Sequence, residues 1–109
     1  MFAANQESEA VKVQRVMAWL GDIYVTNGVL ALTQAPSDKS ALSELFYRHA
    51  SGDWGDMGKA DKKLNDDMLV KGGRVLSTWS LGAQKIFIIT EPDRTRTTAM
   101  LLNDYLYGH

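Results

Sequence analysis

The chain has 109 residues, no cysteine, 45% hydrophobic residues and a formal net charge of −1, and this length and balance fit one globular domain spanning residues 1–109. The lack of cysteine excludes disulfides and thiolate metal sites, and it fits the reducing environment of the cytoplasm. The near-neutral charge gives no overall attraction to nucleic acid, and no apolar run approaches the roughly 18 residues that a membrane span needs, so we expect a cytoplasmic protein that does not enter the membrane.

The first predicted element is an amphipathic helix over residues 7–20. Its apolar side chains recur at helical spacing, and they are Ala10, Val13, Val16, Met17 and Leu20. Ser8 suits the N-cap, and Gly21 suits the position after the last turn. A helix with one apolar face packs either on the core of its own domain or on a partner.

The next segment, residues 22–35, contains conflicting signals. Residues 22–26 are rich in β-prone side chains and predict a short strand. The Asn27-Gly28 pair that follows is a strong hairpin signal. Thr26, however, is equally suited to cap a helix, so the periodicity alone leaves both structures open for this segment.

Two further helices are expected in the middle of the chain. The first begins at Ser37 or Asp38, because Pro36 breaks the preceding segment, and it ends at Gly52. The second covers residues 59–70 and ends at a Gly-Gly pair, which is typical of helix C-termini.

After the Gly-Gly pair the hydrophobic period changes from helical to extended, which predicts strands over residues 74–81, 85–91 and 96–102. A type II′ turn at Gly82-Ala83 joins the first two. The middle strand is apolar on both faces, which places it at the centre of a sheet that is covered on both sides. The order of elements predicts an α+β fold of N-terminal helices packed on a C-terminal antiparallel β-sheet of three to four strands.

His49 is the first candidate catalytic residue, because an imidazole titrates near neutral pH and can act as a general acid or base. Its neighbour Arg48 can bind a phosphate or carboxylate through two parallel hydrogen bonds. A polar cluster at the turn before the last strand is the second candidate, and it contains Glu91, Asp93, Arg94, Thr97 and Thr98. Both groups also have a structural interpretation, since a histidine favours a helix C-terminus and a Pro-Asp pair favours a turn.

No metal or cofactor is expected. The chain has two histidines and no cysteine, which is too few for a dedicated zinc site. Its acidic residues lack the spacing of a calcium-binding loop, and no glycine-rich segment continues into the Gly-Lys-Ser/Thr of a phosphate-binding loop.

Three motifs stand out along the chain: residues 48–55 read RHASGDWG, residues 72–77 read GGRVLS and residues 89–98 read ITEPDRTRTT. Together they resemble a family of small, uncharacterised bacterial proteins found on plasmids, prophages and genomic islands. The resemblance implies that Thr26-Asn27-Gly28 starts a helix, and we therefore favour a helix over residues 26–35. It also implies a family-like core of residues 22–109, with residues 1–21 as an added N-terminal helix.

The family context implies a non-enzymatic accessory protein that binds a protein partner of unknown identity or forms a homodimer. In that interpretation the polar residues form a structural or binding knot made of His49, Asp53, Trp54, Glu91, Asp93 and Arg94. The order of helices and sheet also resembles small metal-independent ribonucleases of the toxin type. The residues that would then converge on a phosphate are His49, Arg48, Arg94 and Thr97 or Thr98. Direct nucleic-acid binding is a third interpretation, which the net charge disfavours.

Overall fold

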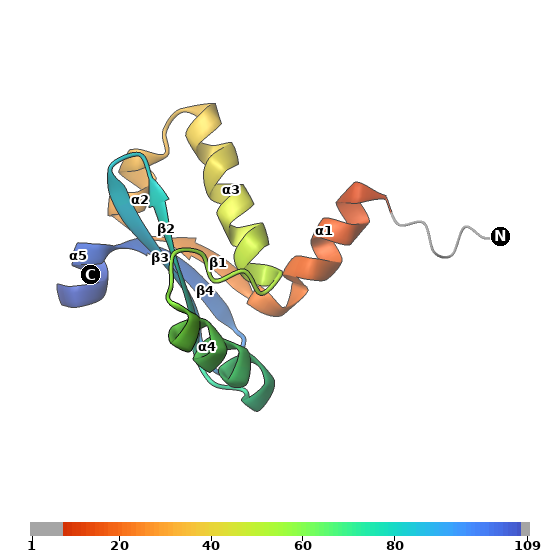
Figure 1. Cartoon of the computed structure of the whole chain (residues 1–109). Coiled ribbons are helices and arrows are strands. Elements are labelled where there is room, and N and C mark those ends of the chain that lie inside the picture. The colour runs from red at the N-terminus through yellow and green to blue at the C-terminus, as the bar shows by residue number, and fades with distance from the viewer. Residues whose placement is uncertain (1–7, 108–109) are drawn as a thin grey trace.

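The computed structural model describes residues 8–107. In this range the chain forms a four-stranded sheet, five α-helices and one short 3-10 helix. In chain order the elements are α1 (Glu9–Met17), η2 (Ala18–Leu20), β1 (Asp22–Val25), α2 (Asn27–Leu32), α3 (Pro36–Ala50), α4 (Lys59–Lys71), β2 (Val75–Leu81), β3 (Gln84–Thr90), β4 (Arg96–Leu101) and α5 (Leu102–Tyr107). The predicted α+β class is confirmed, although α5 follows the sheet and β1 precedes all the α-helices except α1 (Figure 1).

The strands lie in the order β1-β4-β3-β2. β3 pairs antiparallel with both β2 and β4, as predicted for the C-terminal strands, whereas β1 joins β4 in parallel and makes the sheet mixed. A parallel neighbour is possible because helices α2, α3 and α4 lie between the two strands in the chain and supply a long crossover. Gly21 permits the close approach of β1, since a Cβ at this position would lie 2.4 Å from the carbonyl carbon of Thr95.

Several helix boundaries follow local signals. The Ser8 hydroxyl accepts a hydrogen bond from the Val11 N–H (3.1 Å), so Ser8 caps α1 as predicted. Residues 27–32 are helical, which confirms the helix over the hairpin, but the hydroxyl of Thr26 donates to Asp104 (2.6 Å) instead of capping α2. α3 begins at Pro36 itself and not after it, because proline at the first helical position lacks only an N–H that has no partner there.

Two apolar clusters lie on opposite faces of the sheet. On the first face, Ile86 and Ile88 of β3 pack with Leu20 and with the buried side of α3. On the second face, Phe87 and Ile89 pack in a smaller cluster with Met100 and Leu76. α3 lies against the first face, and α5 lies against the second, where Tyr105 stacks on Phe87 (Figure 1). β3 is therefore an interior strand buried on both sides, as its sequence predicted.

The two edges of the sheet differ. At the outer edge of β2, the side-chain amide of Asn65 donates to the carbonyl of Leu76 (2.7 Å) and accepts from its N–H (3.1 Å). Further along that edge, the Thr78 N–H donates to the Trp54 carbonyl and the Thr78 carbonyl accepts from the Asp56 N–H. β1 forms the opposite edge, and no further strand lies beside it in the part of the chain that the structure describes.

Candidate functional site

His49 lies in the last turn of α3, and its side chain is completely buried against the first face of the sheet. Its Nδ1 atom is 2.6 Å from the Ser77 hydroxyl of β2, and its Nε2 atom is 2.9 Å from the Thr90 hydroxyl of β3. The imidazole therefore bridges two strands from above. Both partners come from adjacent positions on one face of the β2–β3 hairpin.

The hydrogen bonds of β4 determine which nitrogen of His49 carries the proton. The Thr97 hydroxyl donates to the Leu20 carbonyl (2.7 Å), so the Thr97 oxygen accepts from the Thr90 hydroxyl (2.7 Å). Thr90 has thereby used its only proton and must accept from His49. The neutral imidazole therefore carries its hydrogen on Nε2.

The other end of this chain of hydrogen bonds agrees with that assignment. Trp79 donates its indole N–H to the Ser77 oxygen (2.6 Å). The Ser77 hydroxyl is then free to donate to the unprotonated Nδ1 atom of His49. Within residues 8–107, every buried side-chain nitrogen and oxygen has a hydrogen-bond partner. The result is one continuous, directed row of hydrogen bonds from Trp79 to the Leu20 carbonyl, which we call the His49 row.

Two indole rings enclose the imidazole. Trp19 of η2 stacks on it with a centroid distance of 5.8 Å, and Trp54 approaches it edge-on at 5.4 Å. Each indole nitrogen is held by another part of the chain, because Trp19 donates to the Ala50 carbonyl (2.9 Å) and Trp54 donates to Asp66 (2.9 Å). The rings thus fix the imidazole and exclude solvent from it.

Burial lowers the pKa of His49 to about 3, and the positive charge of Arg94 acts in the same direction. The imidazole is therefore neutral at pH 7, in agreement with the hydrogen-bond directions. A general acid or base must reach its substrate, and the buried ring of His49 does not reach the surface in this conformation.

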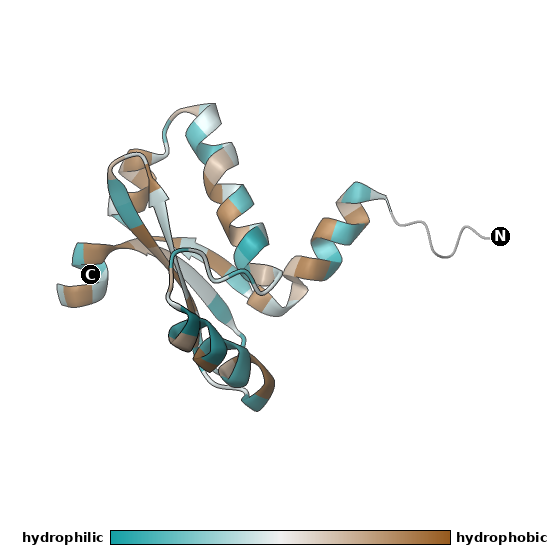
Figure 2. Ribbon diagram, in the orientation of Figure 1, coloured by the Kyte–Doolittle hydropathy of each residue, from teal (hydrophilic) through white to brown (hydrophobic). Residues whose placement is uncertain are grey.

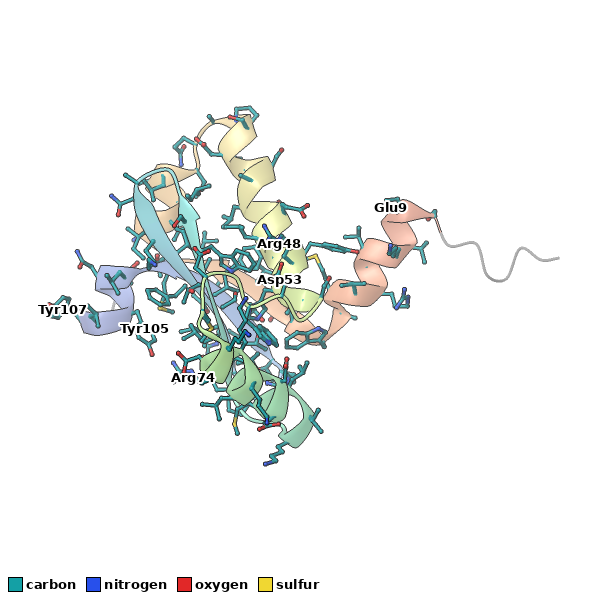
Figure 3. The ribbon with its side chains drawn as sticks, viewed as in Figure 1. Glu9, Arg48, Asp53, Arg74, Tyr105 and Tyr107 are labelled. Atoms are coloured by element: carbon teal, nitrogen blue, oxygen red, sulfur yellow. The ribbon has the colours of Figure 1, made fainter. Side chains whose placement is uncertain are left out.

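The loop after α3 is closed by an exposed ion pair. Arg48 Nε lies 2.9 Å from a carboxylate oxygen of Asp53, and the second oxygen of Asp53 accepts from the Gly55 N–H. Figure 3 shows the two side chains together at the lower end of α3. Burial alone would raise the pKa of Asp53, but the hydrogen bonds from Gly55 and Arg48 outweigh it and hold that pKa below its usual value.

Arg94 connects the β3–β4 turn to the end of α4. Its guanidinium donates to the carbonyls of Gly73 (2.7 Å) and Glu91 (3.1 Å), and it lies 5.5 Å from the centre of the Trp19 ring. The residue has a positive φ of 60°, a backbone conformation that costs a non-glycine residue free energy. The guanidinium also donates to the carbonyls of Met68 (3.4 Å) and Leu69 (3.5 Å), so a positive charge lies at the C-terminal end of α4.

The acidic residues of the same turn have separate roles. Asp93 accepts from both the N–H and the hydroxyl of Thr95, and these bonds lower its pKa. The Glu91 carboxylate lies 4.0 Å from Arg74 and not beside Arg94, which contacts only the Glu91 carbonyl. Both acids therefore shape the turn and do not face His49.

Thr97 and Thr98 were predicted as alternatives, and the structure separates them. Thr97 is completely buried on the first face and belongs to the His49 row. Thr98 pairs with Ile89, whose side chain lies in the second cluster, so Thr98 points to the opposite face. Neighbouring residues of a strand alternate between faces, and only Thr97 lies near His49.

The two polar groups identified in the sequence therefore meet indirectly. Trp19 lies between His49 and Arg94. Its indole ring stacks on the imidazole of His49 and lies next to the guanidinium of Arg94. Sequence reasoning did not assign Trp19, Ser77 or Thr90 to the site. Ser77 and Thr90 do lie inside the segments 72–77 and 89–98, which was the available signal, while Trp19 lies outside them.

An open groove lies apart from the His49 row. It has a volume of about 890 Å³ and is formed by α1, β1, α2 and α3, with a predominantly apolar lining that includes Val13, Met17, Ile23, Val25, Leu30 and Phe46. Figure 2 shows hydrophobic and hydrophilic positions alternating along α1, which borders the groove. None of the polar residues predicted as a site, from Arg48 to Thr98, lines it.

Within residues 8–107 there is neither a candidate metal centre nor a helix that could span a membrane. No group of three or more histidine, aspartate or glutamate residues in this range is arranged to hold a metal ion. None of the helices in this range has the length and apolar character needed to cross a membrane.

Comparison with known proteins adds no relative. No family model matches the sequence, and no curated protein or solved structure matches the chain.

Proposed function

We propose that this protein acts by binding a protein chain in the groove between α1, β1 and α3. The observation that carries the proposal is the exposed apolar lining of the groove. Ile23 and Leu30 are 44% and 48% exposed, although both are large apolar side chains. Contiguous apolar surface of this kind typically marks a site for another macromolecule.

The position of His49 supports binding over catalysis. All donors and acceptors of the imidazole are used within the protein, and two indole rings cover it. Cleavage of RNA by general acid–base catalysis without a metal needs an acid and a base that the substrate can reach. The polar residues predicted as a site act instead as supports for the loop after α3 and for the β3–β4 turn.

The biological context remains part of the same proposal. The motif pattern resembles proteins of plasmids, prophages and genomic islands, and such small accessory proteins commonly act through a partner. We therefore propose a cytoplasmic accessory protein of a mobile element, whose activity is assembly and not chemical conversion.

Photo-crosslinking tests the groove directly. A photoreactive phenylalanine is placed at Leu30, which lines the groove, and in a matched variant at Leu64, a somewhat more exposed leucine on α4. Irradiation is expected to give a discrete protein adduct from Leu30 and none from Leu64. Equal adducts from both positions, or none from Leu30, would contradict binding in the groove.

A nuclease assay tests the competing interpretation. The purified protein is incubated with total RNA in EDTA beside a His49→Gln variant, and we expect the RNA to stay intact in both samples. RNA cleavage by the wild type, lost in a His49→Gln variant that retains its fold, would overturn the proposal in favour of an enzyme.

A further inference from the structure

We infer that the chain bound at the groove is a second copy of this protein, joined by antiparallel pairing of the two β1 strands about a two-fold axis at Tyr24. This inference rests on the proposed function and names its partner. It is carried by the direction of the β1 hydrogen-bonding groups, the position of the groove and the contrast between the two sheet edges.

The main chain of β1 directs part of its hydrogen-bonding groups towards the open edge of the sheet. The N–H groups of Asp22 and Thr26 donate to the carbonyls of Thr95 and Ala99, at 3.0 and 3.1 Å. Alternate residues of a strand direct their N–H and C=O groups to opposite sides. The peptide groups of Ile23 and Val25 therefore point away from β4, along the open edge.

These groups are self-complementary. In an antiparallel pair of β1 strands, Ile23 of one copy lies opposite Val25 of the other, and each such pair exchanges two hydrogen bonds. Tyr24 then lies opposite its own copy in the position without hydrogen bonds. A two-fold symmetric contact requires a surface of this kind, in which the same patch serves both subunits.

The same pairing brings the two grooves together. Ile23 and Val25 share a face with Thr97 and Ala99, and both line the groove. Residues paired across strands lie on one face, so the second copy adds its own Ile23 and Val25 beside them. Figure 1 shows α1 directed away from the sheet.

The charges that line the groove and the covered edge of β2 also favour a second copy as the partner. The groove carries charges of both signs, on Glu9, Glu44 and Lys39, so it does not select a strongly acidic or basic partner, while a second copy supplies both signs. Asn65 and the loop after α3 already cover the edge of β2. With one open edge in the sheet that residues 8–107 form, the pairing closes as a dimer and does not extend into a fibre.

Disulfide trapping tests the predicted register. The chain has no cysteine, so a Tyr24→Cys variant carries one thiol that lies opposite its own copy, with Cα atoms about 4.5 Å apart. A Ser80→Cys variant places the thiol at the other edge as a matched control, because both side chains are exposed. Under mild oxidation we expect the Tyr24→Cys chain to form a covalent dimer at least about tenfold faster. Equal rates would overturn the inference.

Light scattering tests the hydrogen bonds of the edge. The wild type is expected to have twice the chain mass of 12.1 kDa. An Ile23→Pro variant removes an outward donor and leaves the bonds to β4 in place, so it should be monomeric with unchanged circular dichroism. Ser80→Pro, the matched change at the edge of β2, should remain dimeric. A monomeric wild type overturns the inference, and the Leu30 adduct then decides whether the proposed function stands with another partner or fails as well.

Discussion

His49 makes the stability of this protein depend on pH in a direction that follows from its surroundings. The folded chain keeps the imidazole neutral down to about pH 3, whereas an unfolded histidine binds a proton below about pH 6.5. The unfolded state therefore binds more protons in this window. The folded state loses stability as the pH falls from about 6.5 towards 3, by up to about 1.4 kcal/mol per pH unit.

A His49→Gln variant isolates this contribution, because an amide can donate to Thr90 and accept from Ser77 but does not titrate. Urea denaturation between about pH 4.5 and 6, where most carboxylates stay ionised, should show a shallower pH dependence for the variant than for the wild type. Parallel profiles would mean that His49 is protonated in the folded state.

Arg94 combines a strained backbone with useful hydrogen bonds, and two substitutions separate these effects. Arg94→Ala loses the bonds to the carbonyls of Gly73 and Glu91 and keeps a side chain at positive φ. Arg94→Gly loses the same bonds but relieves the backbone. We expect both variants to be less stable than the wild type, with glycine about 1 kcal/mol less destabilising than alanine. Thermal unfolding measures the order, and an alanine variant as stable as the glycine variant would contradict it.

At the scale of elements, Trp54 holds the loop after α3 against the sheet. Its ring is 2% exposed and contacts His49, so Trp54→Ala should lower the free energy of unfolding by about 3–5 kcal/mol. Asp66→Ala removes only the acceptor of the indole N–H and should cost about 1 kcal/mol. Chemical denaturation of both variants gives the comparison. Similar losses would show that the hydrogen bond, and not the buried ring, fixes the loop.

The elements themselves were largely predictable because their signals are local. The Ser8 cap, the glycine that ends α4 and the turn at Gly82 each act within a few residues, and the structure contains all three. The pairing of β1 with β4 was not predictable in this way. It joins Ile23 to Thr97 across most of the chain, and neither strand carries a residue pattern that selects the other as its neighbour.

At the scale of the whole molecule, Asn65 protects the sheet from uncontrolled association. Asn65→Ala leaves the N–H and carbonyl of Leu76 without their partner, which should cost about 2–4 kcal/mol. It also opens a second sheet edge. Dynamic light scattering should then detect species larger than those of the wild type, while a variant that is only less stable, with unchanged particle size, would argue against a protective role.

The candidate site was predictable only in part for a related reason. His49, Trp54, Arg94 and Thr97 were all selected by residue type, and the structure brings them to one region. Their burial and exact partners depend on how α3 is placed on the sheet. Trp19 reaches His49 from η2, and Leu20 of the same short helix is buried in the first cluster.

The tryptophan distribution has a practical consequence for experiments. All three tryptophans of the chain belong to the same region: Trp19 and Trp54 touch His49, and Trp79 bonds to Ser77 in the same row. Tryptophan fluorescence, excited selectively, is therefore a local probe of the folding of this region. Helices α1 and α5 contain no tryptophan, so this fluorescence does not report on them directly. A fluorescence transition that coincides with the far-ultraviolet circular dichroism transition would therefore indicate that the domain folds as one cooperative unit.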